Sequence, residues 1–129
     1  MSKRALIVGI NEFVEARLRL RGCVNDTIAI ENLIKTYYGF VDDDIRILRD
    51  KDATKVKIDE GLSWLMSDYA GDGSDVRLFT FSSHGTRVED QNGDEWECQD
   101  EVIVPHNHKW DDPFRDDDLH NHFKHVPEN

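Results

Sequence analysis

Residues 81–85, Phe-Ser-Ser-His-Gly, carry side chains suited to acid–base chemistry. They end an apolar run that begins at Val76 and predicts a buried strand. Ligand crevices in open α/β sheets lie at the carboxyl ends of the strands, so we expect His84 there. An imidazole titrates near neutral pH and can act as a general base or acid. Gly85 lets the backbone approach a substrate, so its N–H can donate to an oxyanion. A histidine at a strand end is also an ordinary polar residue.

A second candidate segment is Leu20–Asp26, at the junction of a loop and a helix that follow the first strand. Asp26 fits two roles: it can cap the helix, or its carboxylate can pair with an Arg or Lys side chain of a substrate. Cys23, near the helix N-terminus, is either a thiol with a lowered pKa or a small buried apolar residue.

Acidic residues gather in the C-terminal third of the chain and offer the hard oxygen ligands that Ca²⁺ prefers. Their spacing does not match an EF-hand loop, so composition alone favours a solvated acidic surface over a metal site. Histidines 106, 108, 120, 122 and 125 suggest zinc, but no further ligand stands at a fixed spacing from them. The acidic set is Asp90, Asp94, Glu95, Glu97, Asp100, Glu101, Asp116, Asp117 and Asp118.

Alternating strand and helix patterns position these segments. We expect strands at residues 4–10, 45–48, 76–81 and 101–104, a turn at Asn92-Gly93, and a helix at 116–123. Two further helices are expected: one capped by Asn25, Asp26 or Thr27 and stopped by Gly39, the other running from Thr54 to residues 71–73. This βαβαβ order predicts a parallel sheet with helices on its faces. A further strand is expected after residue 129, so the fold is expected to be incomplete there.

Composition narrows the class of protein. The 129 residues are enough for one domain, expected at 1–129, and carry a formal net charge of −11, which disfavours nucleic-acid binding. No apolar run reaches the roughly 20 residues of a membrane span, and no signal peptide is evident, so we expect a cytoplasmic protein. Cys23 and Cys98 form neither a disulfide framework nor a CxxC pair.

Five blocks together resemble metacaspases and related caspase-like cysteine peptidases, in the order and approximate spacing of that family. They are Arg4–Asn11, Leu20–Asp26, Phe81–Gly85, Asp100–Pro105 and Arg115–His120. The resemblance implies a three-layer α/β caspase-like fold, with a mostly parallel sheet flanked by helices. It also implies a His/Cys dyad that cleaves peptides or proteins after Arg or Lys, often with activation by Ca²⁺.

Matching positions give each residue an implied role. His84 resembles the catalytic histidine and Gly85 the oxyanion-hole glycine. Cys23, Asp26 and Ser82 match positions that line the pocket for the basic side chain. Asp100, Asp116 and Asp117 match calcium ligands.

One departure affects activity: the family's nucleophile lies in an Asp-x-Cys-His-Ser-Gly stretch, which these 129 residues do not contain. A histidine without its thiolate cannot perform acyl transfer, so we expect the chain alone to be inactive. Three hypotheses follow. A C-terminal segment or second chain supplies the cysteine; or the chain is a non-catalytic caspase-like module that binds basic segments or calcium; or Cys23 serves His84 as an alternative nucleophile.

Overall fold

The computed structural model describes residues 3–14, 16–69, 75–89, 99–107 and 114–123. A parallel sheet in the order β2–β1–β3 is built from β1 (Lys3–Gly9), β2 (Ile45–Arg49) and β3 (Val76–Ser82). An antiparallel sheet in the order β4–β5–β6 is built from β4 (Gly85–Glu89), β5 (Gln99–Ile103) and β6 (Phe114–Arg115). The helices are α1 (Cys23–Tyr37), α2 (Lys55–Met66) and α3 (Asp116–Phe123), with 3-10 turns η1 (Ala16–Leu18), η2 (Asp42–Asp44) and η3 (Asp50–Asp52).

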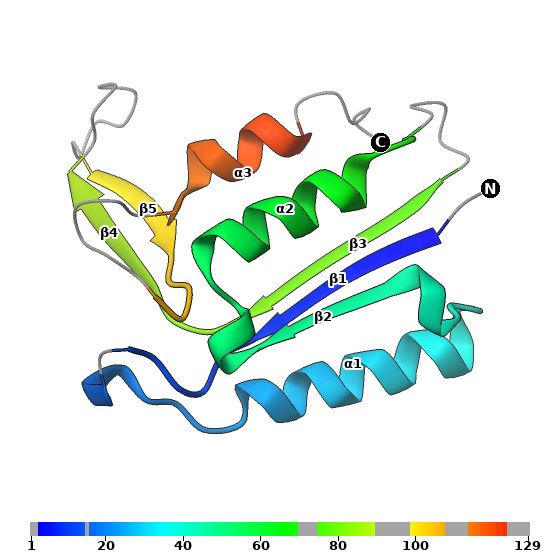
Figure 1. Cartoon of the computed structure of the whole chain (residues 1–129), viewed down its shortest axis with the longest axis horizontal. Coiled ribbons are helices and arrows are strands. Elements are labelled where there is room, and N and C mark those ends of the chain that lie inside the picture. The colour runs from blue at the N-terminus through cyan, green and yellow to red at the C-terminus, as the bar shows by residue number, and fades with distance from the viewer. Residues whose placement is uncertain (1–2, 15, 70–74, 90–98, 108–113, 124–129) are drawn as a thin grey trace.

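Strand β1 is buried on both faces, which explains its uninterrupted apolar sequence. Alternate residues along it join two separate cores, because successive side chains of a strand point to opposite faces. One core packs Ala5 and Ile7 against Ile34 of α1, and the other packs Leu6 and Val8 against Leu62 of α2. In Figure 1, α1 accordingly covers one face of the sheet, whereas α2 and α3 cover the other. The expected three-layer α/β arrangement is confirmed.

The three parallel strands end at one edge of the sheet. Gly9, the last residue of β1, pairs with the last residues of the other two strands, Arg49 of β2 and Ser82 of β3. The chain that leaves β1 and the start of β4 therefore lie at this carboxyl edge, on the left of Figure 1. Among the described residues, no helix is both long enough and apolar enough to span a membrane.

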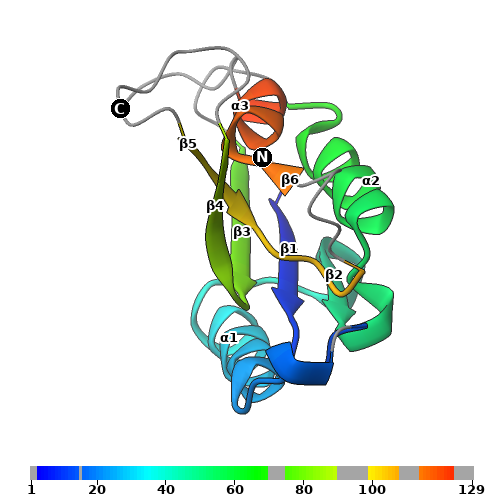
Figure 2. The same cartoon turned by 90° about the vertical axis from the view of Figure 1, so that its left-hand side faces the viewer.

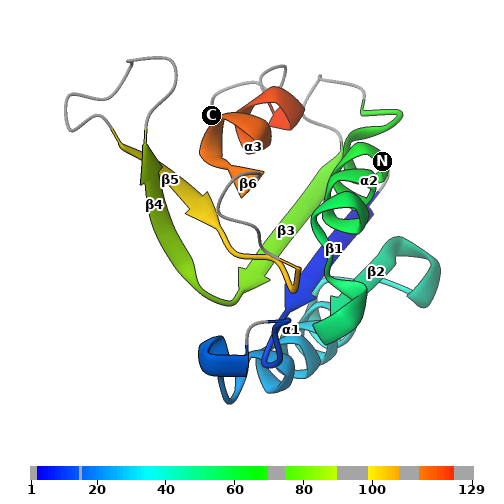
Figure 3. The same cartoon turned by 60° about the vertical axis from the view of Figure 1, so that its left-hand side comes forward.

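The expected strand at 101–104 exists as β5, but it does not extend the parallel sheet. It pairs antiparallel with β4, which the sequence did not predict because Gly-Thr-Arg-Val-Glu lacks an apolar run. Figures 2 and 3 show β4 and β5 leaving the sheet at the end of β3 as a separate layer. The expected turn at Asn92-Gly93 lies outside the described residues.

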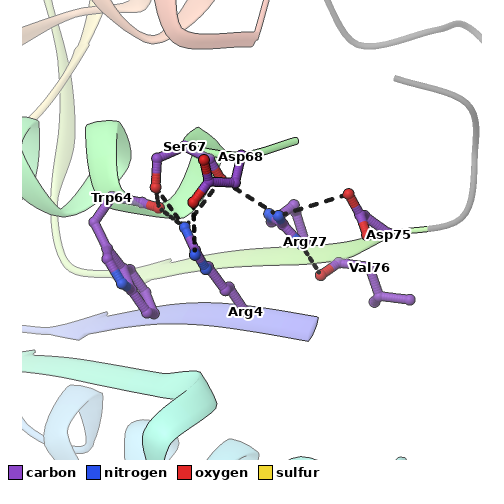
Figure 4. A network of polar contacts seen from close by, with 7 residues as sticks. All are labelled: Arg4, Trp64, Ser67, Asp68, Asp75, Val76 and Arg77. Carbon is purple, nitrogen blue, oxygen red and sulfur yellow. Dashed lines mark hydrogen bonds and ion pairs between the residues drawn. The ribbon is translucent and has the colours of Figure 1, made fainter. Parts of the chain in front are cut away.

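Helix α2 ends earlier than expected, at Met66 rather than at residues 71–73. The cause is a tertiary contact at the opposite edge of the sheet, drawn in Figure 4. The guanidinium of Arg4 donates to the carbonyl oxygens of Trp64 at 2.7 Å and of Ser67 at 2.9 Å. Both carbonyls lie at the helix C-terminus, where carbonyl groups have no N–H four residues further along the helix; that of Trp64 also accepts from Ser67 N–H at 3.2 Å. Arg4 therefore caps α2 from a strand some 60 residues away, and the glycines are not needed to stop it.

Candidate active site

His84 lies between β3 and β4, at the carboxyl edge where the sequence placed it. Its Nε2 atom is 2.6 Å from the carbonyl oxygen of Leu18. A carbonyl can only accept, so Nε2 carries the hydrogen and the neutral ring has Nδ1 as its basic atom. Phe13, only 7% exposed, packs on the same imidazole with ring centroids 5.4 Å apart. The imidazole is thus held by one hydrogen bond and one aromatic contact.

Gly85 begins β4, and the ladder determines which way its backbone N–H points. Val104 N–H donates to the carbonyl of His84 at 3.1 Å, and the two residues are opposite in the β4–β5 register, so they form a hydrogen-bonded pair. Hydrogen-bonded and non-hydrogen-bonded pairs alternate in antiparallel sheets. Gly85, opposite Ile103, therefore directs its N–H away from β5. This donor, next to His84 in the chain, is not used in the β4–β5 ladder.

Helix α1 begins directly beside the end of β1. A Cβ atom on Gly9 would lie 2.3 Å from Cγ2 of Thr27 and 2.6 Å from the carbonyl oxygen of Cys23, so this approach requires glycine. The expected caps Asn25, Asp26 and Thr27 are wrong, because the helix already starts at Cys23 after a left-handed Gly22.

The cap of α1 instead comes from the loop that follows β1. Oδ1 of Asn11 accepts from the backbone N–H of Cys23 at 2.9 Å and of Val24 at 3.3 Å. Two of the helix's unpaired N–H groups are thereby satisfied by a residue outside the helix. The same loop carries Phe13 and Leu18, so it contacts both α1 and His84.

The structure brings together two of the predicted pocket residues. Oγ of Ser82, the last residue of β3, donates to Oδ2 of Asp26 in the first turn of α1, at 2.7 Å. Ser82 stands two residues before His84 in the chain. The Asp26 carboxylate that it binds therefore lies at the same edge of the sheet as His84. Cys23 is a free, half-buried thiol at the first position of α1, and the structure does not test its role as a nucleophile.

The backbone also places the three predicted calcium ligands in one region. Val102 of β5 pairs with Arg115 of β6. Asp100 stands two residues before Val102, and Asp116 directly follows Arg115, so their backbones lie close to this pair. Asp116 and Asp117 then form the first turn of α3. Among the side chains that the structure describes, no three His, Cys, Asp or Glu residues converge on a metal position. His122 instead bonds Oδ1 of Asp59 at 2.7 Å, and His108 and His125 lie outside the described residues.

Sequence reasoning missed the groups that hold His84. The contact from Leu18 uses a backbone carbonyl, which every residue possesses, and Phe13 reads as an ordinary apolar residue in a loop. Asn11 and Asp50 act on backbone N–H groups far away in sequence. The one available signal was a polar Asn directly after an apolar strand, a type that often caps helices.

The sequence is similar to known proteins along nearly its whole length. Residues 3–129 match the family described as "Metacaspase, peptidase C14 domain". Metacaspase-1 of Saccharomyces cerevisiae is 35% identical over 124 residues, and metacaspase-1 of Meyerozyma guilliermondii is 39% identical over 124 residues. Each alignment covers 92% of this chain, but only 28% and 30% of the respective relative. The chain thus spans under a third of these relatives.

The fold has a match among solved structures. A crystal structure of a protein from Geobacter sulfurreducens superposes with a TM-score of 0.71, covering 98% of this chain and 46% of that one. Its sequence is 21% identical, so this match supports the fold alone. The family match over nearly the whole chain, together with the relatives above 30% identity, shows that this chain belongs to the metacaspase family of C14 cysteine peptidases.

Proposed function

We propose that this chain is the histidine-bearing part of a cysteine endopeptidase that cleaves after Arg or Lys, with His84 as general base and acid. The observation that carries the proposal is the 2.6 Å contact between Nε2 of His84 and the carbonyl oxygen of Leu18. Its Nε2–H is engaged by Leu18, so Nδ1 is the atom left to exchange a proton at the carboxyl edge of the sheet.

The chemistry requires a cysteine thiol beside Nδ1. His84 takes the thiol proton while sulfur attacks the scissile carbonyl carbon, and the carbonyl oxygen becomes an oxyanion. The N–H of Gly85, directed away from β5, is the donor we assign to that oxyanion. His84 then returns the proton to the leaving amine, and water hydrolyses the thioester. The residues described here supply the base and a donor, and the cysteine comes from another segment.

An exposed strand edge supports docking of that segment. Strand β3 is terminal in the described sheet, yet Leu78 packs on the α1 side and Phe79 and Phe81 pack on the α2 side. Strands with both faces apolar are typical of sheet interiors. A groove of about 410 Å³ also runs beside this edge, between α1 and β3. Its lining includes Leu33, which is 48% exposed, and Thr80, whose Oγ1 is buried without a hydrogen-bond partner within the described structure.

The crossover rule indicates where such a segment enters. Helix α3 lies on the same face of the sheet as α2, with Phe123 6.4 Å from Phe79 between ring centroids. A right-handed crossover that starts at β3 and passes through α3 returns to the sheet beside β3, on the side away from β1. A parallel strand there ends next to Ser82 and His84. We therefore propose that the cysteine stands at the end of this added strand.

Specificity for a basic side chain is proposed to come from Asp26. Its carboxylate is held by Ser82 at 2.7 Å, and a fixed carboxylate favours a guanidinium or ammonium partner. With the completed enzyme, Asp26→Asn should lower kcat/KM for an Arg substrate at least about tenfold, because a charge-assisted bond contributes about 1.5–3 kcal/mol. Ser82→Ala, which leaves the charge in place, is the matched control and should cost less. Equal losses for Arg and for uncharged substrates would contradict this role.

Calcium is proposed to bind at Asp100, Asp116 and Asp117, whose backbones meet where β5 and β6 pair. The ion would supply positive charge that offsets the repulsion among these carboxylates. Ca²⁺ should raise the melting temperature of the chain more than Mg²⁺ does, and Asp116→Asn should remove the difference. Equal shifts for the two ions, or none, would make the region a plain acidic surface.

Complementation tests the proposed activity. The purified chain is mixed with a separately expressed, cysteine-bearing remainder of a metacaspase domain, and hydrolysis of a fluorogenic Arg- or Lys-terminated peptide is followed. We expect turnover in the mixture, none with either part alone, and none with His84→Ala. If the mixed parts form a complex but remain inactive, the chain functions as a non-catalytic binding module.

A further inference from the structure

We infer that Asp50 is a positioning residue for His84, acting through the loop that follows β1. This inference rests on the proposed role of His84 as base. Residues 11–14 and 16–22 are here called the post-β1 loop. It carries both groups that hold the imidazole: the Leu18 carbonyl on Nε2 and the Phe13 ring.

Asp50 binds the beginning of this loop with one carboxylate oxygen. Its Oδ1 accepts from the backbone N–H of Asn11 at 2.9 Å and of Glu12 at 3.0 Å. Hydrogen bonds to an ionised carboxylate are stronger than neutral ones. Asp50 stands directly after β2, so its side chain fixes the loop to the carboxyl edge of the neighbouring strand.

The backbone of Asp50 is strained. Its φ is +48°, in the left-handed region that non-glycine residues rarely adopt. Such conformations persist only when the surroundings impose them, and they concentrate at functional sites. Glycine would adopt this backbone without strain but would lose the carboxylate. The advantage of aspartate over glycine at position 50 is therefore its carboxylate, which accepts the hydrogen bonds from Asn11 and Glu12.

A second clamp secures the same loop. Nδ1 of His106 donates to the carbonyl of Glu12 at 2.7 Å, and the His106 carbonyl accepts from Val14 N–H at 3.0 Å. His106 N–H in turn donates to Ala53, at the end of the turn that Asp50 begins. Asp50 and His106 thus fix the loop on both sides of Phe13. Leu20 N–H donates to the carbonyl of Asn11 at 2.7 Å, which ties the part of the loop that carries Leu18 to the segment held by Asp50. The orientation of His84 therefore depends on Asp50 through these contacts.

The test is NMR of the His84 ring nitrogens in the intact 129-residue chain, which needs no peptidase activity. Wild-type His84 should populate the Nε2–H tautomer. Asp50→Gly keeps the left-handed backbone and removes the hydrogen-bond acceptor. In this variant the ratio of the Nε2–H to the Nδ1–H tautomer of His84 should fall about fivefold, which corresponds to the loss of one ordinary hydrogen bond. Exchange of the Asn11 and Glu12 amide protons should accelerate in the same variant.

Asp68→Gly is the matched control, because Asp68 is also an aspartate at positive φ, +57°, and lies near the opposite edge of the sheet. It should leave the tautomer ratio of His84 unchanged. Equal shifts in both variants, or an unchanged ratio in Asp50→Gly, would overturn the inference. If Asp50→Gly does not fold, Asp50→Asn is measured instead. Faster exchange of the Glu12 amide proton with an unchanged tautomer ratio at His84 would then refute the inference. Failure of complementation with an intact tautomer would refute the peptidase proposal alone.

Discussion

The close approach of α1 to β1 predicts that Gly9→Ala destabilises the protein. The added Cβ would lie 2.6 Å from the Cys23 carbonyl oxygen, a backbone atom that cannot rotate away, and 2.3 Å from Cγ2 of Thr27. Overpacking of this kind costs about 1–3 kcal/mol, and a backbone contact places this site near the upper value. The lower entropy of the unfolded alanine chain offsets about 0.4–1 kcal/mol. The net loss should be about 2 kcal/mol.

Thermal denaturation converts this loss into a temperature. The entropy of unfolding is about 2.1 cal/mol/K per residue, so a loss of about 2 kcal/mol in 129 residues lowers Tm by about 7 °C. Relief of the clash requires the start of α1 to move away from β1. The hydrogen bond from Ser82 to Asp26 should therefore weaken in the same variant, and the NMR signals of Asp26 report this directly.

Gly61→Ala is the matched control, because it makes the same substitution at another buried glycine. Its Cβ would meet Leu6 side-chain carbons at 2.9 and 3.0 Å, which can rotate, and alanine favours the interior of α2 by about 1 kcal/mol. Its Tm should stay within about 4 °C of the wild type. A Gly9→Ala protein as stable as wild type, or a larger loss for Gly61→Ala, would refute the described junction of β1 and α1.

Three further predictions each concern a single residue. Thr54→Ala should lower the free energy of unfolding in urea by about 1 kcal/mol, because Thr54 Oγ1 caps α2 at Lys57 N–H; an unchanged midpoint would contradict it. Hydrogen bonds to Asp42 and then to Glu31 raise the pKa of Lys35 above 10.5, so Lys35→Gln should be less stable than wild type at neutral pH. That difference should disappear as the pH rises above 10.5, and a constant difference would refute it. Cys23→Ala should leave the completed enzyme active, with at most a change in KM for the basic substrate because Cys23 matches a pocket position; complete loss of turnover would instead make Cys23 the nucleophile.

The elements of the parallel sheet could be predicted because each one buries an apolar pattern of its own. Strand β1 and helix α3 appear within one residue of the expected bounds. The errors lie where a distant residue decides. Asn11 lets α1 begin at Cys23, and Arg4 lets α2 end at Met66. Strand β4 forms by pairing with β5, and its mostly polar sequence has no apolar periodicity from which a strand could be predicted.

In the candidate site, too, side-chain types could be predicted from the sequence, whereas long-range contacts could not. Side chains with distinctive chemistry, His84 and Asp26, were found from type and position, and the structure places both at the carboxyl edge. The orientation of His84 depends on the carbonyl of Leu18 and on the loop fixed by Asp50. Backbone groups and long-range contacts of this kind leave no mark on residue type, so only the folded chain reveals them.

The central claim is that His84 works with a cysteine outside these 129 residues. Hydrolysis of a fluorogenic Arg- or Lys-terminated peptide by the purified chain, with and without Ca²⁺, tests it most directly. No turnover is expected in either condition, because the proposal places the thiol that pairs with His84 in another segment. Turnover that is abolished both by a thiol alkylator and by His84→Ala would mean that Cys23 or Cys98 is the nucleophile, and would contradict the account.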